Sequence, residues 1–500
     1  MRRRATVKLK QPRRRRGEYP QNLTVRMAST DDDSNARDED DFSVFLRWCA
    51  SNSIDVREDA VEFTFAMRGG SAAAGADKNR GVEAKRDLAR GEIVATIPFE
   101  ACLTLRACSR SDIAASVETR LAETKLEAGW LVGLTCALCV ERNEPTSRWR
   151  AYDKVLPRRE NNVVSLWGET ERKLLVGTEL EMTLRDELSA AKSEWERVVE
   201  PIFARHSLAC SFEDYHDART VVSSRAFTLS PNAGVGLVPI ADAFNHRTGG
   251  HDVNVGDGSA ATMTSGDALC VKVTKEDGVR RGQEIFNTYG MLGNANLLNS
   301  YGFAQEENPA DKVHLTTTNI RAEAALAGIS GGQIAKRFEW LESVGLCSSD
   351  GSFAIDKSRD NFRELCDVVW TCITVDELFN RVRHSNTRAD AIDAIFSVSK
   401  SMNTRRENDV YSTLTPEVSD IVSRAIERRL SLYASLPHDS ASGVGKTSEM
   451  EERLALAAQL IRAEREILST TLDFLRSAHE SGCTNKRPKG ADDSAFALFD

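Results

Sequence analysis

The chain has 500 residues, of which 41% are hydrophobic and 28% are charged, and its formal net charge is −9 at pH 7. This length predicts about two to four domains, and the chain lacks the uninterrupted apolar stretch of about 18 residues that a membrane span needs. The acidic balance argues against a general nucleic-acid binder, and 11 scattered cysteines indicate a reducing compartment rather than a disulfide-linked secreted fold.

The first 41 residues carry their charge in two blocks. Arginine and lysine are concentrated in residues 2–16, and residues 31–41 are mostly acidic. Blocks of like charge without apolar periodicity predict disorder, so residues 1–41 are expected to be a disordered arm and the fold to begin near Phe42. The basic block could be a nuclear-localisation signal, a transit peptide, or sequence ahead of a true start at Met27. Its few serines favour the nuclear interpretation over the transit peptide.

Residues 42–108 are expected to form a first, β-rich unit, because short alternating and β-branched runs are separated by small residues. The expected elements are a helix at 42–50, a strand at 61–66, a loop at 69–75, and two strands within 81–98 joined by a turn at Arg90-Gly91.

Residues 109–215 are expected to be a helical insertion, because their apolar residues recur every three or four positions. This spacing is clearest at residues 130–140, 169–188 and 190–203. Cys136 and Cys139 lie inside the first of these helices and no second cysteine pair follows. We therefore interpret them as core residues rather than as half of a zinc or redox site.

Residues 216–308 return to β character from Val221 onward. Strands are expected at 237–240, 252–255, 260–264 and 268–273, separated by glycine-containing turns.

Residues 309–480 are expected to form a helical domain. Its last helix carries apolar residues every seven positions, which predicts a stripe facing the core. These residues are Leu454, Ile461, Leu468 and Leu475. A flexible loop is expected at 437–448, and a disordered tail at 481–500.

Two segments of the 216–308 region carry the strongest chemical signal. Residues 224–227 read Ser-Arg-Ala-Phe and are followed by 238–246, which ends in Asn245-His246. Residues 284–303 contain the run Phe-Asn-Thr-Tyr-Gly and then Tyr-Gly-Phe. Taken alone, an Asn-His pair is often structural and a Tyr-Gly pair is often an ordinary turn. Found together, in this order and at this spacing, the two segments are much more specific than either one alone.

In these motifs the chain resembles the SET-domain methyltransferases, in the branch of Rubisco large-subunit methyltransferase and the ribosomal-protein lysine methyltransferases. The resemblance spans most of residues 42–475. It implies an α+β fold, in which a β-rich SET core with a helical insertion is followed by an all-helical C-terminal substrate-binding domain. It also implies S-adenosyl-L-methionine as cofactor, a lysine on a protein as methyl acceptor, and no metal.

The resemblance assigns roles to the motif residues. Asn245 and His246 would hold the adenine and the amino-acid end of the cofactor. Arg225 would lie beside cofactor and substrate, where its guanidinium suits a carboxylate. Tyr289 would be the catalytic tyrosine and also touch the cofactor, its hydroxyl orienting the methyl group and the amine.

Two further residues are assigned to the substrate. Asp242 would line the lysine side of the site, and Tyr301 would complete the aromatic wall of the lysine channel. The plainer interpretations are a simple salt bridge between Arg225 and Asp242, and core packing for Tyr301 and Phe303.

The first segment departs from the family pattern. The family has a Gly-x-Gly loop that lets the backbone approach the cofactor, whereas here Asn79-Arg80-Gly81 replaces the first glycine with asparagine. Asparagine tolerates unusual backbone angles, so cofactor contacts by Asn79, Arg80 and Gly81 are still predicted.

The predicted function is methylation of a lysine on a non-histone protein, ribosomal or nuclear, by a monomer that binds neither nucleic acid nor membrane. The predicted location is nuclear or cytoplasmic, with the chloroplast as the alternative for a Rubisco-type enzyme. Histidine methylation is an alternative within the same fold, although the branch that does it differs at the Tyr-Gly-Phe position. A non-catalytic SET scaffold that recruits partners through its helical domain is the alternative from another class.

Overall fold

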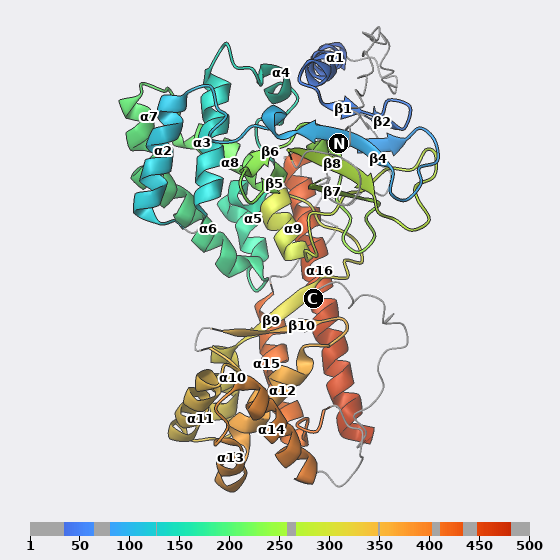
Figure 1. Cartoon of the computed structure of the whole chain (residues 1–500). Helices are drawn as coiled ribbons and strands as arrows, with labels where there is room; N and C mark the ends of the chain where they lie inside the picture. Colours follow the sequence, from blue (N-terminus) through green and yellow to red (C-terminus); the bar gives the residue numbers. More distant parts are fainter. Residues whose placement is uncertain are drawn as a thin grey trace, which may run out of the picture.

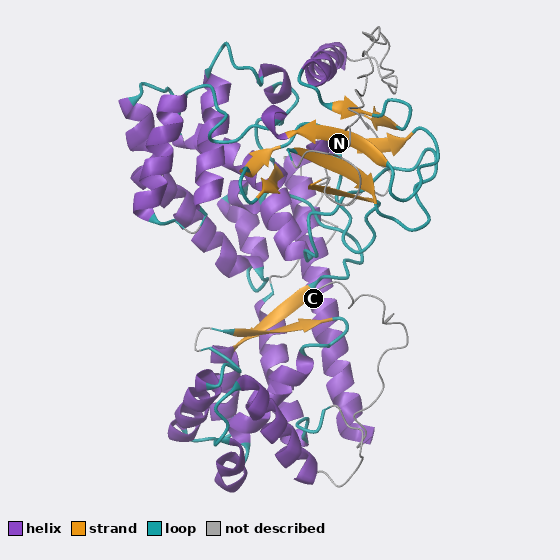
Figure 2. Ribbon diagram, in the orientation of Figure 1, coloured by secondary structure: helices purple, strands orange, loops and turns teal. Residues whose placement is uncertain are grey.

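A computed structural model describes residues 35–64, 81–126, 128–257, 267–348, 351–402, 411–433 and 448–481. Strands and a cluster of helices share one part of the molecule, and a mainly helical part lies below it (Figures 1 and 2). The long helix α16 (Ser448–Ser481) reaches from one part into the other. The predicted strand at 260–264 and the loops at 69–75 and 437–448 lie wholly or almost wholly outside the described residues.

The largest sheet is antiparallel and has the strand order β1-β4-β8-β7. Its strands are β1 (Asp55–Val56), β4 (Ile93–Pro98), β8 (Ala268–Val273) and β7 (Val253–Asp257). Two further antiparallel pairs are β2 (Val61–Thr64) with β3 (Gly81–Ala84), and β5 (Ala226–Ser230) with β6 (Gly234–Leu237). The structure confirms strands within 81–98 and at 268–273, whereas the strand expected at 237–240 ends at Leu237.

Helix α1 (Asn35–Ser51) begins within the acidic segment, earlier than the start near Phe42 that the sequence suggested. Phe42 and Phe45 then anchor the helix in the core.

The insertion between the two β regions is helical, as expected. Its elements are α2 (Ser111–Thr124), α3 (Gly129–Asn143), α4 (Arg150–Asp153), η2 (Val164–Leu166), α5 (Glu169–Arg172), η3 (Lys173–Leu175), α6 (Leu180–Glu194), the π-helical turn η4 (Trp195–Val199), α7 (Glu200–Arg205) and α8 (Phe212–Arg225). Cys136 and Cys139 are buried in α3.

Helix α8 corrects the expected return of β structure at Val221. Ser211 caps the helix by accepting from Asp214 N, and the helix continues to Arg225. Val221 and Val222 are β-branched, but both are fully buried on α8, which packs on α3. Tertiary packing thus overrides their strand propensity.

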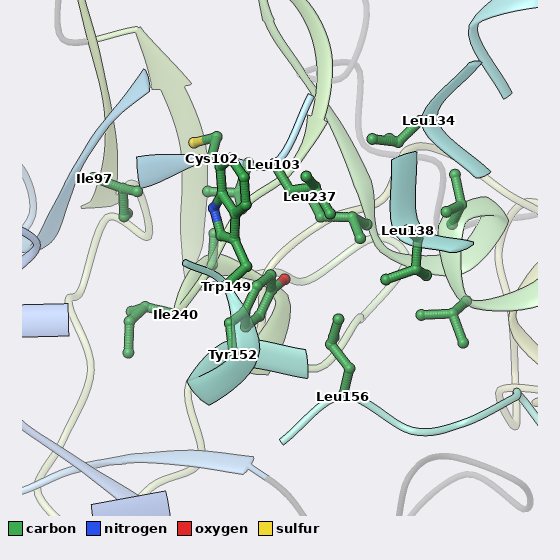
Figure 3. Close-up of a cluster of buried hydrophobic side chains, with 14 of the residues drawn as sticks. Ile97, Cys102, Leu103, Leu134, Leu138, Trp149, Tyr152, Leu156, Leu237 and Ile240 are labelled. Carbon is green, nitrogen blue, oxygen red and sulfur yellow. The ribbon is translucent and has the colours of Figure 1, made fainter. Parts of the chain in front are cut away.

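The core joins the sheet to the insertion. Figure 3 shows Trp149 and Tyr152 packed among apolar side chains that come from both regions. The labelled members include Ile97, Leu103, Leu134, Leu138, Leu237 and Ile240. Because the same cluster buries side chains of both regions, the insertion is fixed relative to the sheet.

The C-terminal part is mainly helical, but the expectation that it is all helical is wrong. Strands β9 (Lys312–Thr316) and β10 (Ser352–Asp356) form an antiparallel pair, and in each strand buried side chains alternate with exposed or partly buried ones. The helices are α10 (Thr317–Leu326), α11 (Gly331–Ser343), α12 (Phe362–Ile373), α13 (Asp376–Val382), α14 (Arg388–Met402) and α15 (Pro416–Leu432), followed by α16.

Helix α16 belongs to two cores. Leu456 and Leu460 pack with Trp167 in a cluster that also contains residues of the insertion. Further along the helix, Ile461 and Leu468 pack in the core of the C-terminal part. Of the predicted seven-residue stripe, Ile461, Leu468 and Leu475 are confirmed as core residues of the C-terminal part, whereas Leu454 is only partly buried.

A buried cluster of ionisable groups connects the insertion with the C-terminal part. Glu179 accepts from Arg429 at 2.9 Å and contacts His314 Nδ1 at 2.5 Å. The backbone N–H of Glu179 donates to Glu464 Oε1 at 3.1 Å, and Tyr433 donates to Glu464 Oε2 at 2.7 Å. Burial, reinforced by the neighbouring charge of Glu179, raises the pKa of Glu464 to about 8.

We expect this carboxyl group to make the stability pH-dependent. A raised folded-state pKa means that the folded protein binds the proton more tightly, so stability should fall as pH rises from about 5 to 8, by up to about 1.4 kcal/mol per pH unit. Glu464→Gln should flatten this slope, measured by urea unfolding across the range. Glu466→Gln, which changes an exposed carboxylate on the same helix, is the matched control. Equal slopes in wild type and Glu464→Gln would contradict the assignment.

Candidate active site

A cavity of about 860 Å³ lies where the two sequence motifs meet the helical insertion. Six of the predicted site residues line it. They are Arg225, Asp242, Asn245, His246, Tyr289 and Tyr301. The structure therefore brings together residues that lie up to about eighty positions apart in the sequence.

The two motifs meet through their backbones. Asn287 N donates to Asn245 O at 2.7 Å, and Arg247 N donates to Asn287 O at 3.0 Å, so His246 and Asn287 form a parallel bridge. Asp252 strengthens this backbone pairing, because its carboxylate accepts from Phe286 N at 3.0 Å. This pairing explains why the motifs have chemical meaning only in combination.

His246 is held in one tautomer. Its Nδ1 accepts from the backbone N–H of Tyr289 at 2.9 Å, so the ring proton must be on Nε2. Nε2 contacts Thr248 Oγ1 at 2.7 Å, and the Thr248 hydroxyl donates onward to Leu292 O at 3.2 Å. Burial, together with the nearby charge of His251, lowers the pKa of His246 to about 4. The ring is therefore neutral at physiological pH.

Aromatic rings form one wall of the cavity. His246 stacks on Tyr289 with ring centroids 4.8 Å apart, and Tyr289 stacks on Tyr301 at the same separation. Phe303 packs against Tyr301 at 6.2 Å. The Tyr289 hydroxyl donates to Phe244 O at 3.1 Å, and burial raises its pKa well above the usual range. Tyr289 is thus a neutral phenol in a fixed position.

Helix α9 (Asn294–Tyr301) positions the far end of this wall. Asn294 N donates to Asp311 Oδ1 at 2.6 Å, and Gln305 N donates to Asn294 Oδ1 at 2.7 Å. Gln305 Oε1 in turn accepts from Thr248 N at 2.8 Å. This chain of contacts ties Tyr301 and Phe303 to the first motif.

Arg225 and Asp242 do more than pair with each other. Arg225 Nε donates to Glu160 Oε1 at 2.8 Å, and its Nη1 donates to the backbone O of Asp242 at 3.1 Å. The Asp242 carboxylate accepts from the Tyr152 hydroxyl at 2.9 Å, while Arg225 Nη1 lies 4.0 Å from the carboxylate. The simple salt bridge considered from the sequence is therefore only part of a larger cluster.

At another part of the lining, Asn245 contacts an acidic residue of the second motif. Its Nδ2 donates to Glu284 Oε1 at 2.7 Å. Burial raises the pKa of Glu284 although this hydrogen bond opposes the shift. Arg247 lies over the ring of Phe286 at 3.7 Å. This side of the cavity thus offers an amide, a carboxyl group and an aromatic face.

In the first segment, the sequence predicted cofactor contacts by Asn79, Arg80 and Gly81. Asn79 and Arg80 lie outside the described residues. Gly81 begins β3 and is buried, and it is absent from the lining of the cavity. Strand β3 nevertheless runs beside the second motif, because Ile285 N donates to Val82 O at 2.7 Å.

Several residues of the site were not found from the sequence. Glu160 and Tyr152 come from the helical insertion, and Thr248 and Gln305 lie just beyond the motifs. Of these four residues, only Thr248 could have been found from the sequence, because it follows the Asn-His pair by two positions.

None of the helices in the described part of the chain combines the length and the apolar character needed to cross a membrane. Within the same residues, no three His, Cys, Asp or Glu side chains gather in an arrangement that could hold a metal ion.

No protein-family model matches the chain. The N-lysine methyltransferase SETD6 of Homo sapiens is 28% identical over 361 residues, which cover 64% of this chain and 72% of that protein. The N-lysine methyltransferase setd6 of Xenopus tropicalis is 23% identical over 480 residues, covering 87% and 95%. The SET domain of LSMT bound to lysine and AdoHcy superposes with a TM-score of 0.62 at 18% identity, covering 89% of this chain and 92% of the other.

The chain has the fold of a SET-domain lysine methyltransferase. Rubisco LSMT bound to AdoMet gives a TM-score of 0.61 at 17% identity over 88% of this chain and 92% of that one. These similarities confirm the predicted SET-domain resemblance and the α+β class with a helical C-terminal region.

The hydrogen bonds of His246 lead to a spectroscopic prediction. Because the folded-state pKa lies below the ordinary value of about 6.5, the ring should stay neutral and protonated on Nε2 down to about pH 5. The unfolded chain binds this proton more readily than the folded protein does. The stability contributed by the neutral His246 ring should therefore be lost as pH falls from about 6.5 toward 4. Nitrogen-15 spectra of histidine-labelled protein should show this signal, and His246→Gln should remove it. A ring that titrates near its ordinary pKa would contradict the network.

Proposed function

We propose that this protein transfers a methyl group from S-adenosylmethionine to the side-chain nitrogen of a lysine on a non-histone protein. The observation that carries the proposal is the meeting of both motifs at one cavity, where a fixed neutral tyrosine stands beside an arginine-carboxylate cluster. The SET-domain fold and the similarity to N-lysine methyltransferases support the same reaction.

The cavity suits this cofactor. Its volume falls within the range of about 300–1,000 Å³ that is usual for small-molecule sites. Asn245, Glu284 and Phe286 provide amide, carboxyl and aromatic groups, which match a ligand with an adenine ring, ribose hydroxyls and an amino-acid end. We propose that Asn245 and His246 hold it. When bound, the cofactor supplies an electrophilic methyl group on a cationic sulfur.

The tyrosine acts by position and not as a base. Its hydroxyl donates to Phe244 O, so the lone pairs of the oxygen remain for weak C–H···O contacts and for the amine. Because burial raises its pKa, the phenol keeps its proton and carries no charge. We infer that Tyr289 orients the attacking nitrogen, which lowers the entropic part of the barrier.

The aromatic wall acts on the lysine side chain. Tyr289 and Tyr301 present stacked ring faces, against which the methylene groups of lysine can pack. A lysine ammonium has an ordinary pKa of about 10.4 and must lose a proton before it attacks. Its transfer from water into this partly buried channel favours the neutral amine.

We propose that residues 309–480 bind the substrate protein, as the resemblance suggests. On the same basis we propose a nuclear or cytoplasmic location, supported by the arginine-rich residues 2–16. A Rubisco-type chloroplast substrate is the alternative, since Rubisco LSMT has the same fold.

Tyr289→Phe tests the reaction. The variant keeps the ring and loses only the hydroxyl, so it should fold and bind cofactor within a few-fold of wild type. Methyl transfer should fall by about a hundredfold or more, the usual effect of removing one well-placed polar group at a reacting centre. The measurement is transfer of labelled methyl from S-adenosylmethionine to fractionated lysate proteins, with the modified residue identified by mass spectrometry.

Tyr433→Phe is the matched control, because it removes a buried tyrosine hydroxyl far from the cavity lining. It should lower stability and leave the transfer rate of the folded enzyme unchanged. Transfer by Tyr289→Phe at the wild-type rate, or modification of a residue other than lysine, would overturn the proposed function.

A further inference from the structure

Thr248 and Gln305 both line the cavity, and they pair with each other through two hydrogen bonds. Thr248 N donates to Gln305 Oε1 at 2.8 Å, and Gln305 Nε2 donates to Thr248 O at 3.2 Å. One side-chain amide thus satisfies both backbone groups of a single residue. This pairing fixes the position of Thr248 relative to Gln305.

A second pairing of the same kind fixes Gln305 to helix α9. Asn294, the first residue of α9, accepts from Gln305 N at 2.7 Å and donates to Gln305 O at 3.0 Å. Asn294 is itself 1% exposed, and the carboxylate of Asp311 accepts from its backbone N–H and from its side chain. Gln305 is therefore tied to the helix whose last residue is Tyr301.

The hydrogen bonds that join Thr248 to His246 all run in one direction. Tyr289 N–H donates to His246 Nδ1, His246 Nε2–H donates to Thr248 Oγ1, and the Thr248 hydroxyl donates to Leu292 O. Thr248 is 2% exposed, so water does not replace its hydroxyl as the acceptor. A turn of the His246 ring would leave a buried donor unpaired, and this holds the ring in place.

Together these contacts close a loop around Tyr289. Its ring lies between those of His246 and Tyr301, with both centroid separations equal to 4.8 Å. Thr248 holds His246, and α9 carries Tyr301, so the pair of Thr248 with Gln305 links the two outer rings of the stack. The separation of the outer rings, and with it the space for Tyr289, depends on this pair.

We propose that Thr248 and Gln305 are positioning residues for methyl transfer, which keep His246 and Tyr301 at the separation that holds Tyr289 in its working orientation. Thr248 acts through the ring of His246. Gln305 acts through Thr248 and through helix α9. This inference rests on the proposed function, because it gives both residues a part in the reaction that Tyr289 is proposed to promote.

Thr248→Val tests the half of the loop that holds His246. Valine has nearly the shape of threonine but gives Nε2–H no acceptor, while the backbone can still pair with Gln305. Nitrogen-15 spectra should then show a second tautomer of His246 or faster exchange of its Nε2 proton. The dissociation constant of S-adenosylhomocysteine, measured by calorimetry on the full chain, should rise by roughly tenfold. Thr248→Ser restores the hydroxyl and should restore both values.

Gln305→Met tests the other half. Methionine has a similar length and no amide, so both hydrogen bonds to Thr248 are lost. With the outer rings held less firmly, the Tyr289 ring should flip faster in carbon-13 spectra of tyrosine-labelled protein, which has only 7 tyrosines to resolve. Tyr289→Phe identifies the signal. Labelled methyl transfer to fractionated lysate proteins at saturating S-adenosylmethionine should slow by roughly tenfold.

Thr135→Val is the matched control. It removes a fully buried threonine hydroxyl that donates to Leu131 O within α3, away from the cavity lining. It should lower the melting temperature and leave the His246 and Tyr289 signals, the cofactor affinity and the transfer rate unchanged. A purely structural role for Thr248 would make Thr248→Val behave in the same way.

Folded Thr248→Val with an unchanged His246 signal and cofactor affinity would overturn the proposal, as would Gln305→Met with an unchanged Tyr289 ring and transfer rate. If Thr248→Val does not fold, wild type decides, since a His246 Nε2 proton that exchanges with water as fast as in free histidine refutes the hydrogen bond to Thr248. If Gln305→Met does not fold, Gln305→Glu replaces it, because glutamate cannot donate to Thr248 O. Failure of the proposed function would look different, since the spectra would change as expected while wild type methylated no lysine.

Discussion

The site depends on a short backbone crossing, in which Asn287 pairs with the residues on either side of His246. Each of these hydrogen bonds contributes on the order of 1 kcal/mol, but their larger effect is geometric. The crossing brings the Tyr289 N–H to the ring of His246, which fixes the tautomer and the ring plane. The aromatic stack through Tyr289 to Tyr301 follows from that one orientation.

The ion pairs around this crossing differ in where they lie. Buried ion pairs are weak evidence for stability, because the cost of desolvation offsets most of their attraction. Glu194 pairs with Arg219 inside the insertion, where the pair fixes packing. Arg225, by contrast, contacts Glu160 and Asp242 at the lining of the cavity, where a ligand can meet all three side chains.

The sequence predicts the elements whose patterns have a single interpretation. Strand β8 has the expected bounds, and α3 contains the expected buried helix, because each has a clear period. The end of α8 and the pair β9 and β10 were missed, since short apolar runs fit both helix and strand and only packing decides between them. The six motif residues at the cavity were found through family resemblance. Glu160 and Tyr152 were not, because their roles arise from contacts across 65 and 90 positions of sequence, which no local pattern encodes.

Helix α16 determines how the C-terminal part can contribute to function. Leu456 and Leu460 complete the apolar cluster around Trp167, and Arg453 donates to Glu171 and to Asn161 O of the insertion. Gly177, with a φ of 82°, lies so close to the backbone of Leu432 that a side chain there would collide with it. The C-terminal part is therefore packed onto the catalytic part and not joined by a loose linker. A substrate bound to its helices would approach the cavity in a fixed orientation, so selection among lysines can arise from distance and direction as well as from the residues beside the target.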